Sequence, residues 1–223
     1  MFGRIQLEGV FTEEVQGKIG LKEDRPVLLL TSTSYTPDED LGLLLKALVL
    51  YADRARQDGS LPRLHLIVTG AGPLKKQFIK HFEEFNRDKS FGKVKIETKW
   101  LEIDDYPRMV AAADLGICMH MSSSNLDLPM KVVDMFSCQL PCFAYDYPTI
   151  GELVHSSGSQ PNGALFKAEK DLYELLTSHF SGGVDKAIAS LKAYSDNLES
   201  FTKETWEDHW NEVMLAPGAN ILE

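Results

Sequence analysis

The stretch Val27-Leu28-Leu29-Leu30 contains no polar side chain, and the sequence on either side of it repeats a simple pattern. A loop rich in serine and threonine follows, and then residues 41–56 carry apolar side chains at the spacing of an α-helix, among them Leu44, Leu45, Leu48 and Tyr51. Residues 64–68 (LHLIV) form the next apolar run, after Gly59 and Pro62 have ended the helix. A buried strand, a helix and a second buried strand predict a parallel βαβ unit.

The same alternation continues to residue 145. Strands are expected at residues 94–98, 115–119 and 141–145, and helices from Pro73 to about residue 85 and at residues 106–113 and 129–138. The fold class is therefore α/β: a Rossmann-like parallel sheet with helices on both faces, plus C-terminal helices from Asp171 onward. Trp206 and Trp210 stand four residues apart there, a spacing typical of packing side chains.

Three segments follow from this pattern. Residues 25–160 are expected to form the Rossmann-like domain, residues 161–223 a helical segment that completes it, and residues 1–24 a linker or remnant.

Composition excludes several classes of function. The chain has 223 residues, 43% of them hydrophobic, and a formal net charge of -10, which argues against a surface for nucleic acid or anionic membrane. It does not exclude a small anionic ligand, because backbone N–H groups at a helix N-terminus can bind a diphosphate. The sequence shows no signal peptide and no apolar stretch of membrane-spanning length.

The three cysteines, Cys118, Cys138 and Cys142, form no CxxC pair. Buried thiols in a reducing compartment are the expected reading. No histidine lies at zinc-ligand spacing from them, so no metal site is predicted.

Parallel sheets bind ligands beyond the carboxyl ends of their strands, so the informative loops are residues 32–40, 70–73, 98–105 and 120–130. Gly70-Ala71-Gly72-Pro73 stands where a phosphate-binding loop would stand, between a strand and a helix. Lys75 occupies the third glycine position of GxGxxG, however, and no GK[ST] follows. Taken alone, this segment is better explained as a tight turn.

Residues 122–136, SSSNLDLPMKVVDMF, carry more chemistry. Pro129 fits the first turn of a helix, and the N–H groups of Met130 and Lys131 would point to the ligand edge beside the serine hydroxyls. Lys131 and these N–H groups suit a diphosphate, and the carboxylates of Asp127 and Asp134 suit ribose and hexose hydroxyls. Alternatively, Asp127 caps the helix and pairs with Lys131. The residues alone leave both interpretations open.

The run LDLPMKVVDMF, with the serines before it, resembles the signature segment of the eukaryotic chitobiosyldiphosphodolichol β-mannosyltransferases. Further blocks are similar to that family in the same order and spacing from about residue 25 to residue 154: residues 32–40 (STSYTPDED), 69–73 (TGAGP), 100–101 (WL), 105–107 (DYP) and 113–116 (ADLG).

The resemblance implies the C-terminal, donor-binding half of a GT-B glycosyltransferase. That family transfers mannose from GDP-mannose to the second GlcNAc of a dolichol-diphosphate-linked chitobiose, inverting to a β1,4 link, on the cytosolic face of the endoplasmic reticulum membrane. The resemblance implies no cofactor, the acidic composition argues against a nucleic-acid partner, and association with other mannosyltransferases of that membrane is a further expectation. A family member is about twice this length, so the catalytic base is expected on a preceding domain, and this chain alone is expected to bind donor weakly without transferring mannose.

Two alternatives stay open. One is a non-catalytic binding or regulatory module derived from the enzyme. The other is a different GT-B sugar-nucleotide transferase, against which Ser34 and Glu39 count, because the wider families carry Arg and Lys at the matching positions.

The resemblance also suggests roles for single residues. Asp134 occupies the place of a ribose-binding Glu, and Asp127 resembles the acidic residue that contacts the donor sugar, although seven positions rather than eight separate the two. Trp100 either walls a guanine or packs, and His120 either contacts phosphate or is an ordinary loop histidine. The expected donor-binding residues are Ser32, Ser34, Gly70, Gly72, Trp100, His120, Ser122, Ser123, Ser124, Asp127, Met130, Lys131 and Asp134.

Overall fold

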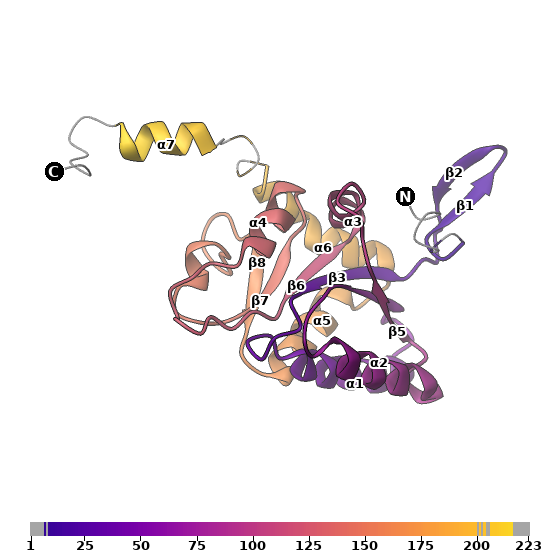
Figure 1. Cartoon of the computed structure of the whole chain (residues 1–223). Helices are drawn as coiled ribbons and strands as arrows, with labels where there is room; N and C mark the ends of the chain where they lie inside the picture. The colour runs from indigo at the N-terminus through magenta and orange to yellow at the C-terminus, as the bar shows by residue number, and fades with distance from the viewer. Residues whose placement is uncertain (1–6, 8, 200, 202, 204–205, 216–223) are drawn as a thin grey trace.

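The apolar run that begins at Val27 lies in a central strand of a parallel sheet. A computed structural model describes residues 7, 9–199, 201, 203 and 206–215 of the chain. Within these residues, one sheet has six strands in the order β5-β4-β3-β6-β7-β8, and every neighbouring pair is parallel (Figure 1). The strands are β3 (Val27–Thr33), β4 (Leu64–Gly70), β5 (Val94–Lys99), β6 (Leu115–Cys118), β7 (Cys142–Tyr145) and β8 (Gly163–Phe166).

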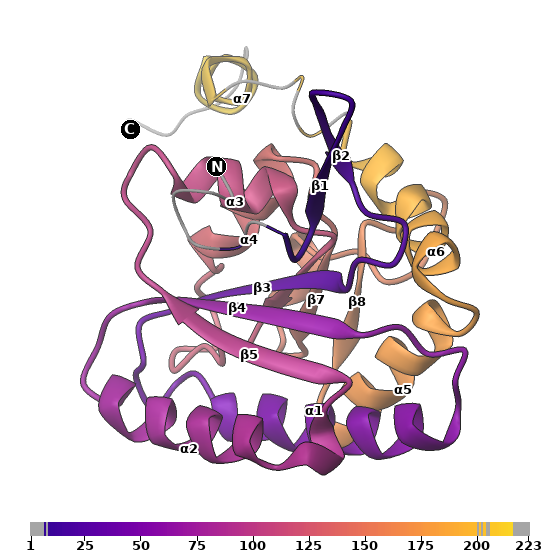
Figure 2. The same cartoon turned by 90° about the vertical axis from the view of Figure 1, so that its right-hand side faces the viewer.

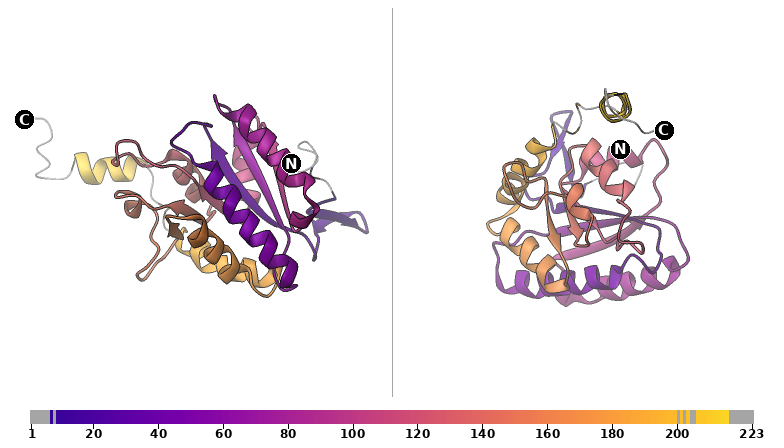
Figure 3. Two further views of the ribbon diagram at one scale, coloured as in Figure 1. Left: turned by 90° about the horizontal axis from the view of Figure 1, so that it is seen from below. Right: turned by 90° about the vertical axis from the view of Figure 1, so that its left-hand side faces the viewer.

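Helices cover both faces of this sheet, as the unbroken apolar strands require. The helices are α1 (Leu41–Gln57), α2 (Lys75–Arg87), α3 (Tyr106–Ala112), α4 (Met130–Ser137), α5 (Glu169–Phe180), α6 (Val184–Asn197) and α7 (Trp206–Met214), with short 3-10 turns at Lys89–Phe91 and Ile150–Glu152. Figure 2 shows α1, α2 and α5 below the sheet and α3 and α4 above it, and the left panel of Figure 3 looks onto the layer of α1 and α2.

The core is divided in two by the sheet. Val27 and Leu29 point into one cluster, with buried side chains of α1, α2 and α5, and Leu28 and Leu30 point into the other, with those of α3 and α4. Successive residues of a strand face opposite sides, so the single run VLLL supplies both halves of the core. The predicted α/β class with helices on both faces is confirmed.

Two features were not predicted. β8 adds a sixth strand within residues 161–223, which were expected to be helical. Residues 1–24 were expected to be a linker or remnant, but β1 (Thr12–Val15) and β2 (Lys18–Leu21) form an antiparallel hairpin that projects from the sheet (Figure 1), and Phe11 is buried in the core. The segment boundaries at residues 25 and 160 remain predictions.

The expected C-terminal helices begin at Glu169. Trp210 in α7 is 42% exposed, and the side chain of Trp206 lies outside the described residues, so the packing role expected for these tryptophans stays a prediction.

None of the described helices is both long and apolar enough to cross a membrane. All three cysteines are free; Cys118 and Cys142 are buried as expected, whereas Cys138 is only partly buried, and burial raises the pKa of Cys118 to about 12. Across the described part of the chain, no cluster of three His, Cys, Asp or Glu side chains is arranged to hold a metal ion.

Candidate functional site

The direction of the strand order reverses between β3 and β6, and the space beyond the carboxyl ends of these two strands is called the crevice below. The chain winds outward from β3 through β4 to β5 on one side, and from β6 through β7 to β8 on the other. Ligands of doubly wound sheets bind beyond the carboxyl ends of the strands at such a switch point. The loop after β3 and the loop after β6 meet here: Met121 N donates to Asp38 O at 2.7 Å, and Glu39 and His120 form an isolated antiparallel bridge.

Three consecutive acidic residues end the loop after β3, and each has a different partner. Asp40 caps α1 by accepting from Leu43 N at 3.0 Å. Glu39 is only 3% exposed and accepts hydrogen bonds from Ser34 N, at 2.7 Å, and from the Thr33 hydroxyl. Asp38 faces His120 across the crevice.

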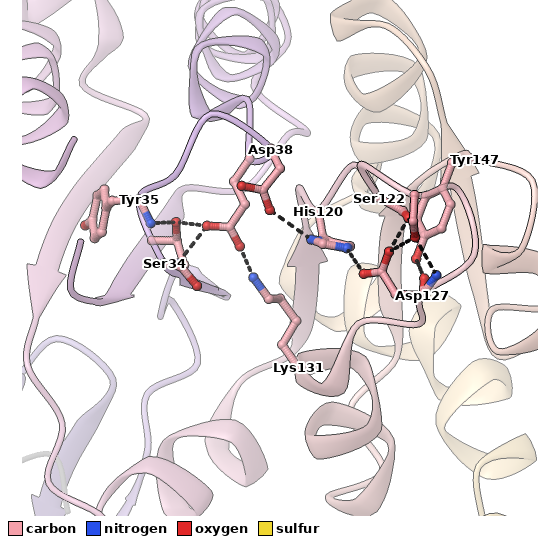
Figure 4. A network of polar contacts seen from close by, with 11 residues as sticks. Ser34, Tyr35, Asp38, His120, Ser122, Asp127, Lys131 and Tyr147 are labelled. Carbon is pink, nitrogen blue, oxygen red and sulfur yellow. Dashed lines mark hydrogen bonds and ion pairs between the residues drawn. The ribbon is translucent and has the colours of Figure 1, made fainter. Parts of the chain in front are cut away.

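Glu39 also forms an ion pair with Lys131, from the first turn of α4 (Figure 4). The Lys131 side chain is 17% exposed, and burial lowers its pKa to about 8, a shift that the Asp38 carboxylate opposes. We expected Lys131 to offer a free positive charge to a diphosphate. Its charge is instead already compensated by a carboxylate.

Asp127 is held by three donors. Its carboxylate accepts from the Ser122 hydroxyl, from the Ser124 hydroxyl at 2.8 Å and from His120 Nε2 at 2.8 Å. The interpretation in which Asp127 caps the helix and pairs with Lys131 is therefore wrong: α4 has no side-chain cap, and Lys131 pairs with Glu39.

This environment fixes the chemistry of Asp127. The hydroxyls of Ser122 and Ser124 and then His120 hold its pKa well below the ordinary aspartate value. An ionised carboxylate whose partners all donate can only accept further hydrogen bonds, and half of the side chain is exposed to receive them. A group of such low basicity is a poor general base at neutral pH.

His120 lies between two carboxylates (Figure 4). Its Nε2 faces Asp127, and its Nδ1 lies 3.4 Å from Asp38 Oδ2. Since both ring nitrogens face protein carboxylates, neither is placed to take a proton from a substrate. Tyr147 packs edge-on against the ring at 6.0 Å and donates its hydroxyl to Asp127 O at 2.9 Å, which anchors the loop after β6.

Asp134 belongs to a second, adjoining cluster. Tyr106 OH, from the start of α3, lies 3.2 Å from Asp134 Oδ2 and 3.4 Å from Ser32 Oγ at the end of β3. Residues from β3, α3 and α4 thus meet around the Tyr106 hydroxyl, and burial raises the pKa of this phenol. Ser32 and Asp134 were both predicted to bind the donor, whereas Tyr106, which joins them, was not.

Gly70 and Gly72 allow the turn after β4 to lie directly against the backbone at the end of β3. A Cβ on Gly70 would lie 1.9 Å from Thr33 O, and one on Gly72 would lie 1.6 Å from Ser34 O. Gly70 also has φ +129°, which favours glycine. The tight turn at residues 70–73 therefore presses on the end of β3, and Leu74 N donates to Tyr35 O at 3.1 Å.

Trp100 stands free of the core. It is 63% exposed just beyond β5, so the packing interpretation is wrong, and its indole N–H donates to Glu102 at 3.1 Å. Lys75 Nζ lies 5.9 Å from the ring centroid and donates to Gly70 O at 2.7 Å. An exposed ring at the ligand edge can accept a planar base.

The predicted residues thus divide into groups. Ser34, His120, Ser122, Ser124, Asp127 and Lys131 share the network of Figure 4, Ser32 and Asp134 share Tyr106, and Gly70, Gly72 and Trp100 lie on the neighbouring loops. Ser123 and Met130 are exposed beside the network. Prediction missed the roles of Asp38, Glu39, Tyr106 and Tyr147. The acidic run at residues 38–40 was the available signal.

Comparisons with known proteins agree with this architecture. A family model described as "Glycosyl transferases group 1" matches residues 25–179. The chain is 40% identical over 207 residues to chitobiosyldiphosphodolichol beta-mannosyltransferase of Mus musculus, covering 92% of this chain and 41% of the mouse protein. The human protein of the same name is 38% identical, with 92% and 43% covered.

A plant relative carries a different name. UDP-glycosyltransferase TURAN of Arabidopsis thaliana is 40% identical over 220 residues, covering 92% of this chain and 45% of the plant protein. The chain therefore spans less than half the length of the curated relatives it matches here.

Solved structures show the same fold at low identity. S. aureus TarM, in complex with fondaparinux, alpha-GlcNAc-glycerol and UDP, has a TM-score of 0.58 at 12% identity, covering 84% of this chain and 34% of TarM. Anabaena HepE in complex with UDP-glucose has a TM-score of 0.53 at 17% identity, covering 80% of this chain and 47% of HepE.

Proposed function

Because this chain belongs to the group 1 glycosyltransferases, we propose that it is the donor-binding half of a mannosyltransferase that uses GDP-mannose. The observation that carries the proposal is the Asp127 carboxylate, ionised, fixed by three donors and half exposed at the switch point of the sheet. Such a group binds hydroxyl donors, and sugars present several of them.

The rest of the crevice supports a nucleotide beside that sugar. Asp134, next to Tyr106 and Ser32, offers a carboxylate for ribose hydroxyls. Trp100 offers a ring face for the base. The diphosphate between them would be held by backbone N–H groups at the start of α4 and by the serine hydroxyls, with Lys131 sharing its charge with Glu39.

The sugar and its acceptor are inferred from the relatives. The mouse and human proteins are named as mannosyltransferases acting on chitobiosyldiphosphodolichol, which motivates mannose as the donor sugar and a dolichol-diphosphate-linked chitobiose as the acceptor. We propose accordingly that the reaction occurs at the cytosolic face of the endoplasmic reticulum membrane, as the family resemblance implies. The Arabidopsis name specifies UDP, so base preference must be measured.

We assign the catalytic base to a part of the enzyme outside this chain. Inversion needs a base that deprotonates the acceptor hydroxyl while the nucleotide diphosphate departs. Asp127 is too weakly basic, and both nitrogens of His120 face carboxylates. The task of this half is to bind the donor and to stabilise the departing diphosphate.

Calorimetry with GDP, UDP and GDP-mannose tests the proposal. We expect GDP to bind at least about tenfold more tightly than UDP, and Asp134→Ala to weaken GDP binding about tenfold, the effect of losing one charged hydrogen bond. Asp53→Ala, on the exposed side of α1, is the matched control and should bind as the wild type does. Equal or absent binding of all three ligands would contradict the proposal, and so would robust mannose transfer to a chitobiosyl lipid by this chain alone.

A further inference from the structure

His120 joins two loops that approach each other from opposite sides of the switch point. Asp127 and its serine partners lie within five positions of one another, so Ser122 and Ser124 hold the carboxylate only relative to its own loop. Asp38 belongs to the loop after β3. The imidazole, 15% exposed, spans from Asp38 Oδ2 at 3.4 Å to Asp127 Oδ2 at 2.8 Å and ties the local cluster to the other side of the crevice.

The two carboxylates are not equivalent in this bridge. Asp127 receives the shorter contact, and its Oδ1 is already occupied by the two serine hydroxyls. The bond from Nε2 therefore sets the rotation of the carboxylate plane, which decides where its exposed lone pairs point. Tyr147 packs against the imidazole ring and binds the backbone of Asp127, so the ring and the carboxylate are held by a common neighbour.

We propose that His120 is a positioning residue: it orients the Asp127 carboxylate toward the hydroxyls of the donor sugar, and so sets the preference for the sugar nucleotide over the bare nucleotide. This inference rests on the proposed function, because it takes Asp127 as the group that contacts the sugar. His120 itself acts through Asp127 and through no bond to the ligand.

Two amide substitutions separate the two ends of the bridge. The side-chain nitrogen of glutamine reaches the place of Nε2, whereas that of asparagine reaches only the place of Nδ1. His120→Gln therefore keeps the donor to Asp127 and His120→Asn loses it. A residue that merely fills space would tolerate both substitutions, or neither.

The experiment measures the dissociation constants of GDP and GDP-mannose for the wild type, for both variants and for His155→Asn, an exposed histidine away from the crevice. We expect the ratio of the two constants to stay within about twofold of the wild type in His120→Gln and His155→Asn. In His120→Asn the affinity for GDP-mannose should fall about tenfold relative to the affinity for GDP, the effect of one charged hydrogen bond. An unchanged ratio in His120→Asn, or an equal loss in His120→Gln, would overturn the proposal.

A second measurement needs no ligand. Carbon-13 NMR follows the titration of the Asp127 carboxyl, which His120 helps to keep ionised. We expect about tenfold higher proton affinity in His120→Asn and little change in His120→Gln. No change in His120→Asn would refute the positioning role even if the wild type bound no nucleotide, whereas failure of wild-type binding alone would refute only the proposed function.

Folding of the variants is checked by their thermal unfolding midpoints. Should His120→Asn fail to fold, His120→Ala removes the same donor to Asp127. We expect it to shift the ratio in the same direction by about tenfold, and a wild-type ratio in that variant would count against the proposal.

Discussion

Lys131 and Glu39 stand 92 positions apart in the chain and form an ion pair at the floor of the crevice. The pair therefore places a carboxylate beside the only lysine of the serine-loop segment, residues 122–136. A diphosphate bound here would meet a neutral pair, and its charge would have to be balanced chiefly by backbone N–H groups.

Removing one partner of this ion pair should lower the free energy of unfolding more than removing both partners together. Glu39→Gln or Lys131→Met leaves a buried charge without its partner, and we expect each to lower the free energy of unfolding by about 3 kcal/mol. The double variant Glu39→Gln/Lys131→Met should recover at least half of the summed loss. Denaturant unfolding of all four proteins measures this coupling. Additive losses would show that the two charges act independently.

Gly72 should tolerate no side chain. In Gly72→Ala the new Cβ would overlap Ser34 O, a backbone atom that cannot move aside cheaply. We expect a loss of about 3 kcal/mol in unfolding free energy, as for other strained sites, together with weaker nucleotide binding. Gly59→Ala is the matched control, because a Cβ there meets nothing within 4 Å, and it should change stability by no more than about 0.5 kcal/mol. Equal effects of the two changes would refute the explanation by close approach.

Trp100 should matter for binding and not for stability. Its ring is mostly exposed, so Trp100→Ala should leave the unfolding midpoint unchanged while weakening GDP binding about tenfold, the usual effect of losing a stacked ring. Trp210→Ala removes another exposed ring, on α7, and serves as the control. Calorimetry measures the GDP affinity of both variants. If Trp100→Ala binds GDP as tightly as the wild type and Trp210→Ala do, Trp100 is not part of the binding site.

His65 predicts a pH dependence of stability. This β4 side chain is 2% exposed, and burial lowers its pKa to about 4, against the opposing influence of Glu97. Between about pH 6.5 and pH 4 the unfolded chain takes up a proton that the folded chain does not, so the folded state loses stability as the pH falls through this window. The loss from this residue should reach about 3 kcal/mol below pH 4.

The test compares the pH dependence of unfolding free energy in three proteins. His65→Leu should flatten the curve between pH 6.5 and pH 4, whereas His155→Asn should keep the wild-type slope. Burial is the main cause of the lowered pKa, and the charges of Lys95 and Lys99 contribute less, so the slope should persist at moderate salt. An identical slope in His65→Leu would mean that other groups control it.

Much of the fold could be predicted because its parallel strands are buried on both faces and read as unbroken apolar runs. The runs VLLL at the start of Val27–Thr33 and LIV in the middle of Leu64–Gly70 are of this kind. Gly163–Phe166 was missed because four residues, one of them glycine, carry too little of that signal. The hairpin at Thr12–Leu21 was missed because its side chains are mostly exposed and it lies among charged residues.

The candidate site could be predicted only in part. The composition of residues 122–136 pointed to Asp127 and its serines, which are neighbours in the chain. The partners of Lys131 and Asp134 come from other elements, and which loops meet is decided by strand order. Glu39 and Tyr106 therefore became visible only in three dimensions.

The bond from Met121 N to Asp38 O joins the two loops through their backbones, before any ligand arrives. Fixing the backbone of a loop costs conformational entropy, on the order of 1 kcal/mol for every residue fixed. In this protein the two loops lose that entropy when the domain folds, and not when a ligand binds. The joined loops are therefore already in place when a nucleotide binds. Its affinity depends on the contacts that it makes, and is not reduced by the cost of ordering these loops.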